Sequence, residues 1–130
     1  MYSEMIIQNY TAAADIKAGQ FVANVASNDV TAPKCQPAGL TVEKIQVLGV
    51  SLKDSSAGDV VSFYPFITGK TLQVRAGAAI SAGVPIGFDA NGDAVEAAAG
   101  YAAAPMWSLN AAAAAGDMID AVVVHTCGIV

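Results

Sequence analysis

The side chains best suited to covalent chemistry are few and scattered in this chain of 130 residues. The one histidine is His125, and the two cysteines are Cys35 and Cys127. A hydroxyl or thiol nucleophile would need His125 as its base, but His125 stands in a strand-like run close to Cys127, where it is poorly aimed. No Gly-x-Ser-x-Gly motif presents a nucleophile. The sequence therefore predicts no enzymatic activity.

Metal and cofactor motifs are equally sparse. Cys35 and Cys127 share no CxxC spacing, so a zinc site is not expected. The run Asp89-x-Asn91-x-Asp93 resembles the start of a calcium loop, but Gly92 precedes Asp93 and position twelve is Gly100 instead of glutamate. No phosphate-binding glycine loop occurs. We expect no metal, no cofactor, and free thiols in a reducing cytoplasm.

The composition indicates a folded chain with an unusually uncharged surface. Charged residues make up 13% and apolar residues 55%, whereas about 25% charged is usual. Such hydrophobicity excludes disorder, and no apolar run reaches the roughly 18 residues of a membrane span. Because interface cores are depleted of charge, we expect other protein to cover part of the surface. A compact, alanine-rich monomer is the alternative.

The charges are also unevenly distributed. Residues 1–75 carry all six Lys and Arg side chains and six acidic ones. Residues 76–130 carry no Lys or Arg and five acidic side chains, which are Asp89, Asp93, Glu96, Asp117 and Asp120. Binding to nucleic acid or to anionic lipid needs clustered Lys and Arg. Neither nucleic acid nor a membrane is therefore an expected partner.

Glycines and prolines divide the chain into short apolar runs that are typical of strands. The Asn91-Gly92 pair predicts a tight hairpin turn, and Pro65 predicts a sheet edge or a bulge. Residues 110–115 could form one or two helical turns that Gly116 would end. The expected strands are Ile45–Leu52, Val60–Phe66, Thr71–Arg75, Val84–Phe88 and Met118–His125.

Two short motifs occur twice, in the same order. Ile16–Val22 resembles Ile80–Ile86 at an offset of 64, and Val50–Asp59 resembles Trp107–Asp117 at an offset of 57 to 58. Each Ala-Gly pair fits a turn between strands, since glycine tolerates a positive φ. The repeat predicts two similar halves in one all-β barrel or sandwich.

Several of these segments together resemble the small capsid decoration, or cement, proteins of tailed bacteriophages. The resemblance covers residues 16–125 and implies a β-barrel or β-tulip fold, usually trimeric, on the outer face of an icosahedral head where coat subunits meet. It implies no catalytic residues. The segments that carry it are Gly49–Leu52, Ala57–Asp59, Ile80–Gly83, Ile86–Asp89, Asn91-Gly92 and Ala115–Asp117.

The amino-terminal end has two interpretations. Residues 1–15 form either an arm that pairs with a neighbouring subunit or the first strand of the domain, and residues 16–130 form a single barrel-like domain. The residues at the start of the chain lack the features of a secretion signal, which predicts synthesis in the host cytoplasm. Trp107 is either a core residue or a contact. The candidate interface residues are Tyr2, Met5, Ile6, Ile7, Tyr10, Tyr64, Phe66 and Trp107.

These observations predict a structural virion protein with two partners, the major capsid protein and further copies of itself in a homotrimer. It would stabilise the head from the outer capsid surface. Two alternatives remain open, namely a tail or baseplate module and a small-ligand-binding β-barrel with an apolar pocket.

Overall fold

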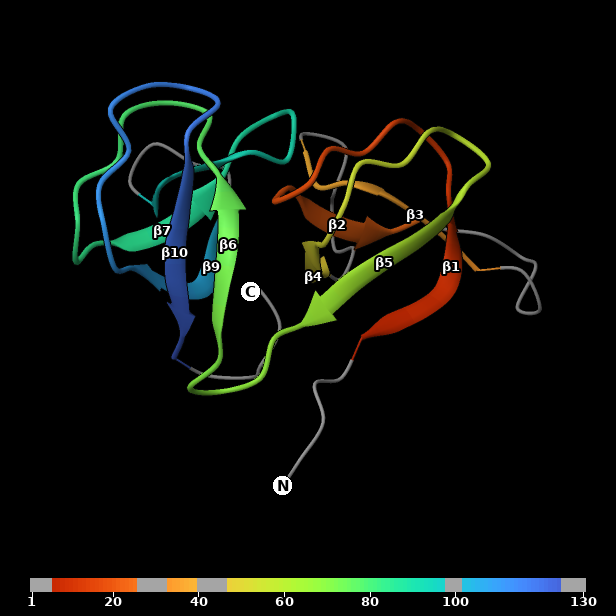
Figure 1. Ribbon diagram of the computed structural model, residues 1–130, viewed down its shortest axis with the longest axis horizontal. Coiled ribbons are helices and arrows are strands. Elements are labelled where there is room, and N and C mark those ends of the chain that lie inside the picture. Colours follow the sequence, from red (N-terminus) through yellow and green to blue (C-terminus); the bar gives the residue numbers. More distant parts are fainter. Residues whose placement is uncertain (1–5, 26–32, 40–46, 98–101, 125–130) are drawn as a thin grey trace.

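Ten β-strands form the regular structure of the part of the chain that the structure describes (Figure 1). The computed structural model describes residues 6–25, 33–39, 47–97 and 102–124, and no α-helix occurs in these ranges. Accordingly, no helix there is long and apolar enough to cross a membrane. The all-β prediction is confirmed. The strands are β1 (Ile7–Ala12), β2 (Phe21–Asn24), β3 (Lys34–Pro37), β4 (Val47–Ser51), β5 (Val60–Pro65), β6 (Thr71–Arg75), β7 (Pro85–Phe88), β8 (Ala94–Glu96), β9 (Ala102–Ser108) and β10 (Met118–Val123).

The strands fall into two halves that lie side by side along the long axis of the molecule (Figure 1). The first half is a closed barrel with the order β1-β3-β2-β4-β5, in which β1 also pairs with β5. The second half is a five-stranded sheet with the order β6-β10-β9-β7-β8. A parallel bridge between Ala76 and Ala94 links the two ends of that sheet.

The two halves have the same topology. In the first half, β1 pairs with β5, β5 with β4, β4 with β2 and β2 with β3. In the second half the equivalent pairs are β6 with β10, β10 with β9, β9 with β7 and β7 with β8. The register also matches, because Thr11 lies opposite Val60 in one half and Arg75 opposite Met118 in the other. The predicted pseudo-repeat is therefore confirmed at the level of the backbone.

The repeated sequence motifs make matching backbone bridges. Ile16 and Ser55 exchange two hydrogen bonds of 2.8 Å, and Ile80 and Ala112 exchange two of 2.9 and 3.0 Å. These partners are related by the same offsets that relate the sequence motifs. The short similarity in sequence thus marks positions where the chain repeats its turns.

The glycine turns of the repeat also match. The Gly19 amide donates to Ser51 O over 2.9 Å, and the Gly83 amide donates to Ser108 O over 2.8 Å. Their φ angles are +82° and +75°, which only glycine adopts without strain. The Ala-Gly pairs are turns, as the sequence predicts.

The predicted helical turn at residues 110–115 is wrong. Ala112 is held in its bridge to Ile80, and the Asp117 carboxylate accepts hydrogen bonds from the amides of Ala113 and Ala114 at 2.9 and 3.2 Å. So short a segment gains too few helical hydrogen bonds to offset the cost of helix nucleation. Instead of a helix, these residues form a turn that the Asp117 side chain caps.

The hairpin predicted from Asn91-Gly92 joins β7 to β8. Asp89 Oδ1 accepts hydrogen bonds from the amides of Asn91 and Asp93 at 2.8 and 3.0 Å, and Gly92 has a φ of +84°. The Asp89 carboxylate thus stabilises the turn by accepting hydrogen bonds from its backbone.

The interpretation of Pro65 as a sheet edge needs correction. β5 has neighbours on both sides, β1 and β4. Pro65 is its last residue and lies opposite Gly49, beyond the final β1 pair between Ile7 and Phe63. The position tolerates proline because no further ladder bond toward β1 is needed there.

Two apolar clusters form the core. One fills the first barrel and contains Ala12, Ile16, Val22, Cys35, Val61 and Phe63. The other fills the second half and also includes Phe21, Ala23, Val50 and Phe66 from the outer side of the first barrel. Along β2, Val22 points into the barrel while Phe21 and Ala23 point into the shared cluster. The halves are consequently joined by a common core, in which the Phe21 ring lies 6.0 Å from that of Phe88 and 6.2 Å from that of Phe66.

The Gly19 turn of the first half contacts the second half directly. Its carbonyl accepts a 2.9 Å hydrogen bond from the Arg75 amide. A β-carbon at Gly19 would lie 2.7 Å from Arg75 N and 2.6 Å from Met118 Cε, whereas one at Gly83 would meet nothing within 4 Å. The two turns share a conformation and differ only in what covers them.

This difference makes Gly83→Ala a matched control for Gly19→Ala. In both variants an alanine must adopt a positive φ, which lowers the free energy of unfolding by about 1–2 kcal/mol. Gly19→Ala additionally forces a clash with backbone, for which overpacking costs of about 1–3 kcal/mol are typical. Urea denaturation should show a clearly larger loss of unfolding free energy for Gly19→Ala. Equal losses would contradict the close packing of the two halves at this turn.

Removal of residues 1–10 should abolish cooperative folding. It deletes most of β1, including the pairs of Ile7 with Phe63 and Tyr10 with Val61 and the edge-to-face contact between the rings of Tyr10 and Phe63 at 5.5 Å. Removal of residues 1–5 is the control, because it leaves β1 intact. Thermal melting followed by circular dichroism tests this, and a cooperative, near-native melt of the longer deletion would overturn it.

Candidate interaction surface

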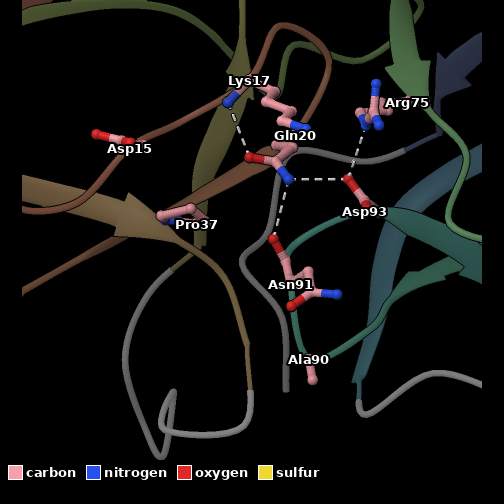
Figure 2. Close-up of a pocket in the computed structure, with 8 residues that line it drawn as sticks. All are labelled: Asp15, Lys17, Gln20, Pro37, Arg75, Ala90, Asn91 and Asp93. Carbon is pink, nitrogen blue, oxygen red and sulfur yellow. Dashed lines mark hydrogen bonds and ion pairs between the residues drawn. The ribbon is translucent and has the colours of Figure 1, made fainter. Parts of the chain in front are cut away.

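A cavity of about 440 Å³ lies at the junction of the two halves (Figure 2). Its walls come from the β1–β2 connection, the ends of β3 and β6, and the β7–β8 hairpin. The lining residues are Asp15, Lys17, Gln20, Pro37, Arg75, Ala90, Asn91 and Asp93.

Gln20 is the centre of the polar contacts in this cavity. Its side chain is buried, and its Oε1 accepts a 2.9 Å hydrogen bond from the Lys17 amide. Its Nε2 donates to Asn91 O at 3.1 Å and to Asp93 Oδ1 at 2.9 Å. Figure 2 shows that these bonds cross from the first half to the second. Gln20 therefore fixes the relative position of the halves.

An ion pair extends the same network. Arg75 Nε lies 3.5 Å from Asp93 Oδ1. Burial raises the pKa of the Asp93 carboxyl, and the Asp89 charge adds to this, while the Gln20 hydrogen bond and the Arg75 and Lys17 charges lower it. Asp93 of the second half is thus a partly desolvated carboxylate that accepts a hydrogen bond from Gln20 of the first half.

The lining of this cavity combines cationic and acidic side chains. Two cations, Lys17 and Arg75, face two carboxylates, Asp15 and Asp93, so the charges balance. The described lining contains no serine, cysteine or histidine to act as a nucleophile or base. The arrangement is suited to holding the halves together.

The chemically reactive candidates divide between buried and undescribed positions. Cys35 is a free thiol inside the first barrel, where burial raises its pKa to about 11. It therefore stays protonated at neutral pH and is a poor nucleophile. Cys127 and His125 lie outside the described residues. No group of three or more His, Cys, Asp or Glu in the described ranges could hold a metal ion.

The amino-terminal interface candidates do not lie together on an exposed surface. Tyr2 and Met5 lie outside the described residues. Ile6 is exposed, whereas Ile7 and Tyr10 are half-buried in β1 and pack against the core of the first barrel. The structure places residues 7–12 in the barrel wall.

The three remaining candidates occupy different environments. Tyr64 is half-buried on β5, with Lys70 Nζ 5.4 Å from the centre of its ring. Phe66 is buried in the cluster shared by the halves, so its side chain serves the internal junction. Trp107 is exposed on β9, opposite Pro85 of β7, which removes the interpretation of Trp107 as a core residue.

Sequence reasoning missed most of the exposed apolar surface. A further cavity of about 270 Å³ at the junction has Leu52 and Met118 in its lining. Leu52 and Leu109 are equivalent in the repeat and both exposed, so a comparison of the two halves could have found them. The exposed large apolar residues that were missed are Leu52, Val60, Ile67, Leu109, Met118 and Val124.

Comparison with solved structures identifies a protein of the same fold. The chain is similar to the head fiber gp8.5 N base of bacteriophage phi29, with a TM-score of 0.70 and 20% sequence identity. The match covers 92% of this chain and 94% of that one. No family model and no curated protein sequence matches the chain. Over the matched 92% of the chain, the fold is therefore that of the head fiber base.

Asp93 should make stability depend on pH in a defined direction. A pKa raised by folding means that the folded state holds the proton more tightly, so stability falls as pH rises from the unfolded pKa through the folded one. Asp93→Asn should flatten this fall. Arg75→Gln should steepen it, because it removes a charge that lowers the pKa. Melting temperatures across the acidic range test this, and equal slopes in both variants and the unaltered protein would refute it.

Proposed function

We propose that this chain is a structural component of a phage head, attached to the outer face of the capsid where coat subunits meet. The observation that carries the proposal is the likeness in fold to a head fiber base over nearly the whole of both chains. The resemblance of its sequence segments to capsid decoration proteins supports it independently, since that resemblance rests on residues and not on the fold.

The surface chemistry supports a binding role. Large apolar side chains are exposed on several elements, among them Val60, Trp107 and Leu109. Where such side chains join into a large contiguous patch, the patch marks an interaction site, whereas single exposed ones are ordinary. With only 13% charged residues, the chain gains stability when a partner covers part of this surface.

The proposed mechanism is mechanical and needs no catalysis. Apolar and main-chain contacts added across a junction between coat subunits favour the assembled head by mass action. Many copies on one lattice multiply the effect of each contact. The partners are the major capsid protein and other copies of the chain, in a homotrimer. The acidic second half suits the outside of a head, away from packaged DNA.

The test uses heads purified from a phage mutant that lacks this chain. Adding the purified protein should give saturable binding, density on the outer capsid face at coat-subunit junctions in cryo-electron microscopy, and heads that open at a higher temperature. Bovine serum albumin, similarly acidic, controls for non-specific adsorption. Failure to bind heads, or density confined to the tail, would overturn the proposal, and the latter result would establish a tail module.

A further inference from the structure

One apolar face is covered in the first half and open in the second. In the first half this face consists of Phe21, Val50 and Phe66, which are 0%, 1% and 8% exposed because the second half covers them. We call this set the covered face. It lies on the outer side of β2 and β4 and just beyond the end of β5.

The equivalent positions in the second half are Pro85, Trp107 and Val124, which we call the open face. Phe21 pairs with Val50 across two strands, and Pro85 pairs with Trp107 in the same way. Phe66 follows the last residue of β5, and Val124 follows the last residue of β10. Pro85 is exposed, and Trp107 and Val124 are 44% and 42% exposed.

The open face is apolar although none of the residues that the structure describes covers it. Strand residues that face solvent are normally polar, and a tryptophan here occupies the position of a buried valine. The turns beside the two faces differ in the same way. Gly19, beside the covered face, is packed against Arg75 and Met118, whereas a β-carbon at Gly83, beside the open face, would meet nothing within 4 Å. A partner that covers the open face would bury both the apolar face and this turn.

We propose that the partner is a second copy of this chain, which docks the end of its first half on the open face. At the internal junction the covered face packs on the core of the second half. Beside it, β6 lies next to β4, and Met118 and the Arg75 amide lie against the Gly19 turn. In the first half the equivalent elements are β1 and Val60. Val60 is 53% exposed, more than any other large apolar residue in the described ranges.

The charge distribution favours this head-to-tail arrangement. Every Lys and Arg lies in residues 1–75, and residues 76–130 carry five acidic groups and neither Lys nor Arg. Two second halves placed face to face would repel each other, whereas a second half on a first half would not. β1 lies at the end of the molecule farthest from β6–β10 (Figure 1), so it is accessible to another copy.

The contact between copies differs from the internal junction in one respect. The Arg75 amide is bonded to Gly19 O, but the equivalent Thr11 amide is already bonded to Pro33 O at 3.1 Å. The contact therefore rests on side chains, with Trp107 and Leu109 of one copy against Val60 of the next. Head-to-tail contacts of this kind close into rings when the rotation permits. The inference rests on the self-association in the proposed function, and not on attachment to a head.

The experiment measures association in solution, without heads, by sedimentation equilibrium. The unaltered protein should self-associate, while Trp107→Lys and Val60→Glu should each weaken association by at least about thirtyfold, as loss of an interface hot spot does. Mixed in equal amounts, the two variants should form a one-to-one dimer and nothing larger. Each variant keeps the face that the other has lost, so one contact can form.

Controls separate a lost contact from a lost fold. Ile67→Lys and Ile67→Glu alter an exposed residue of the β5–β6 connection that belongs to neither face, and they should associate normally. Circular dichroism checks folding, and Leu109→Lys replaces Trp107→Lys if the latter unfolds. A monomeric unaltered protein, full association of Val60→Glu, or no dimer in the mixture would overturn the inference. Since no heads are present, these outcomes are independent of capsid binding.

Discussion

The molecule depends on one interaction, in which the outer side of the first barrel packs against the second half of the chain, which repeats the same fold. β2 shows its effect on sequence, because Phe21, Val22 and Ala23 are all buried, two in the shared cluster and one inside the barrel. A strand buried on both faces reads as a continuous apolar run. Part of the low charge of the chain therefore arises from this internal junction, before any partner is considered.

The two halves differ in how their sheets close. β1 and β3 close the first barrel by parallel pairing at Ala12 and Cys35, whereas the described residues of the second half show the single bridge between Ala76 and Ala94. The Arg75 amide of the second half bonds the Gly19 carbonyl of the first half, while the equivalent Thr11 amide bonds Pro33 within the first half. The looser closure of the second half thus accompanies a main-chain bond between the halves that has no counterpart at β1.

Sequence alone predicted the parts of the fold that local chemistry determines. All five expected strands correspond to observed ones (β4, β5, β6, β7 and β10), because β-branched and aromatic residues concentrate there. The other strands were not expected: β1 was left as either an arm or a strand, β2, β3 and β8 have four residues or fewer, and β9 contains three alanines and Pro105. The junction cavity could not be predicted, since Gln20 and Asp93 are brought together only when the halves pack. For the same reason Phe66 resembled a contact residue but is buried.

Because the two halves repeat one backbone, the burial of a residue in one half can be compared with the exposure of the equivalent residue in the other. Backbone bridges and glycine turns are kept at equivalent positions, although most side chains differ between the halves. The 20% identity to the head fiber base is likewise combined with a shared fold. The two halves therefore keep one backbone frame but differ in which apolar faces are covered. Trp107 shows this difference, because it stands at the position equivalent to the buried Val50 and is itself 44% exposed.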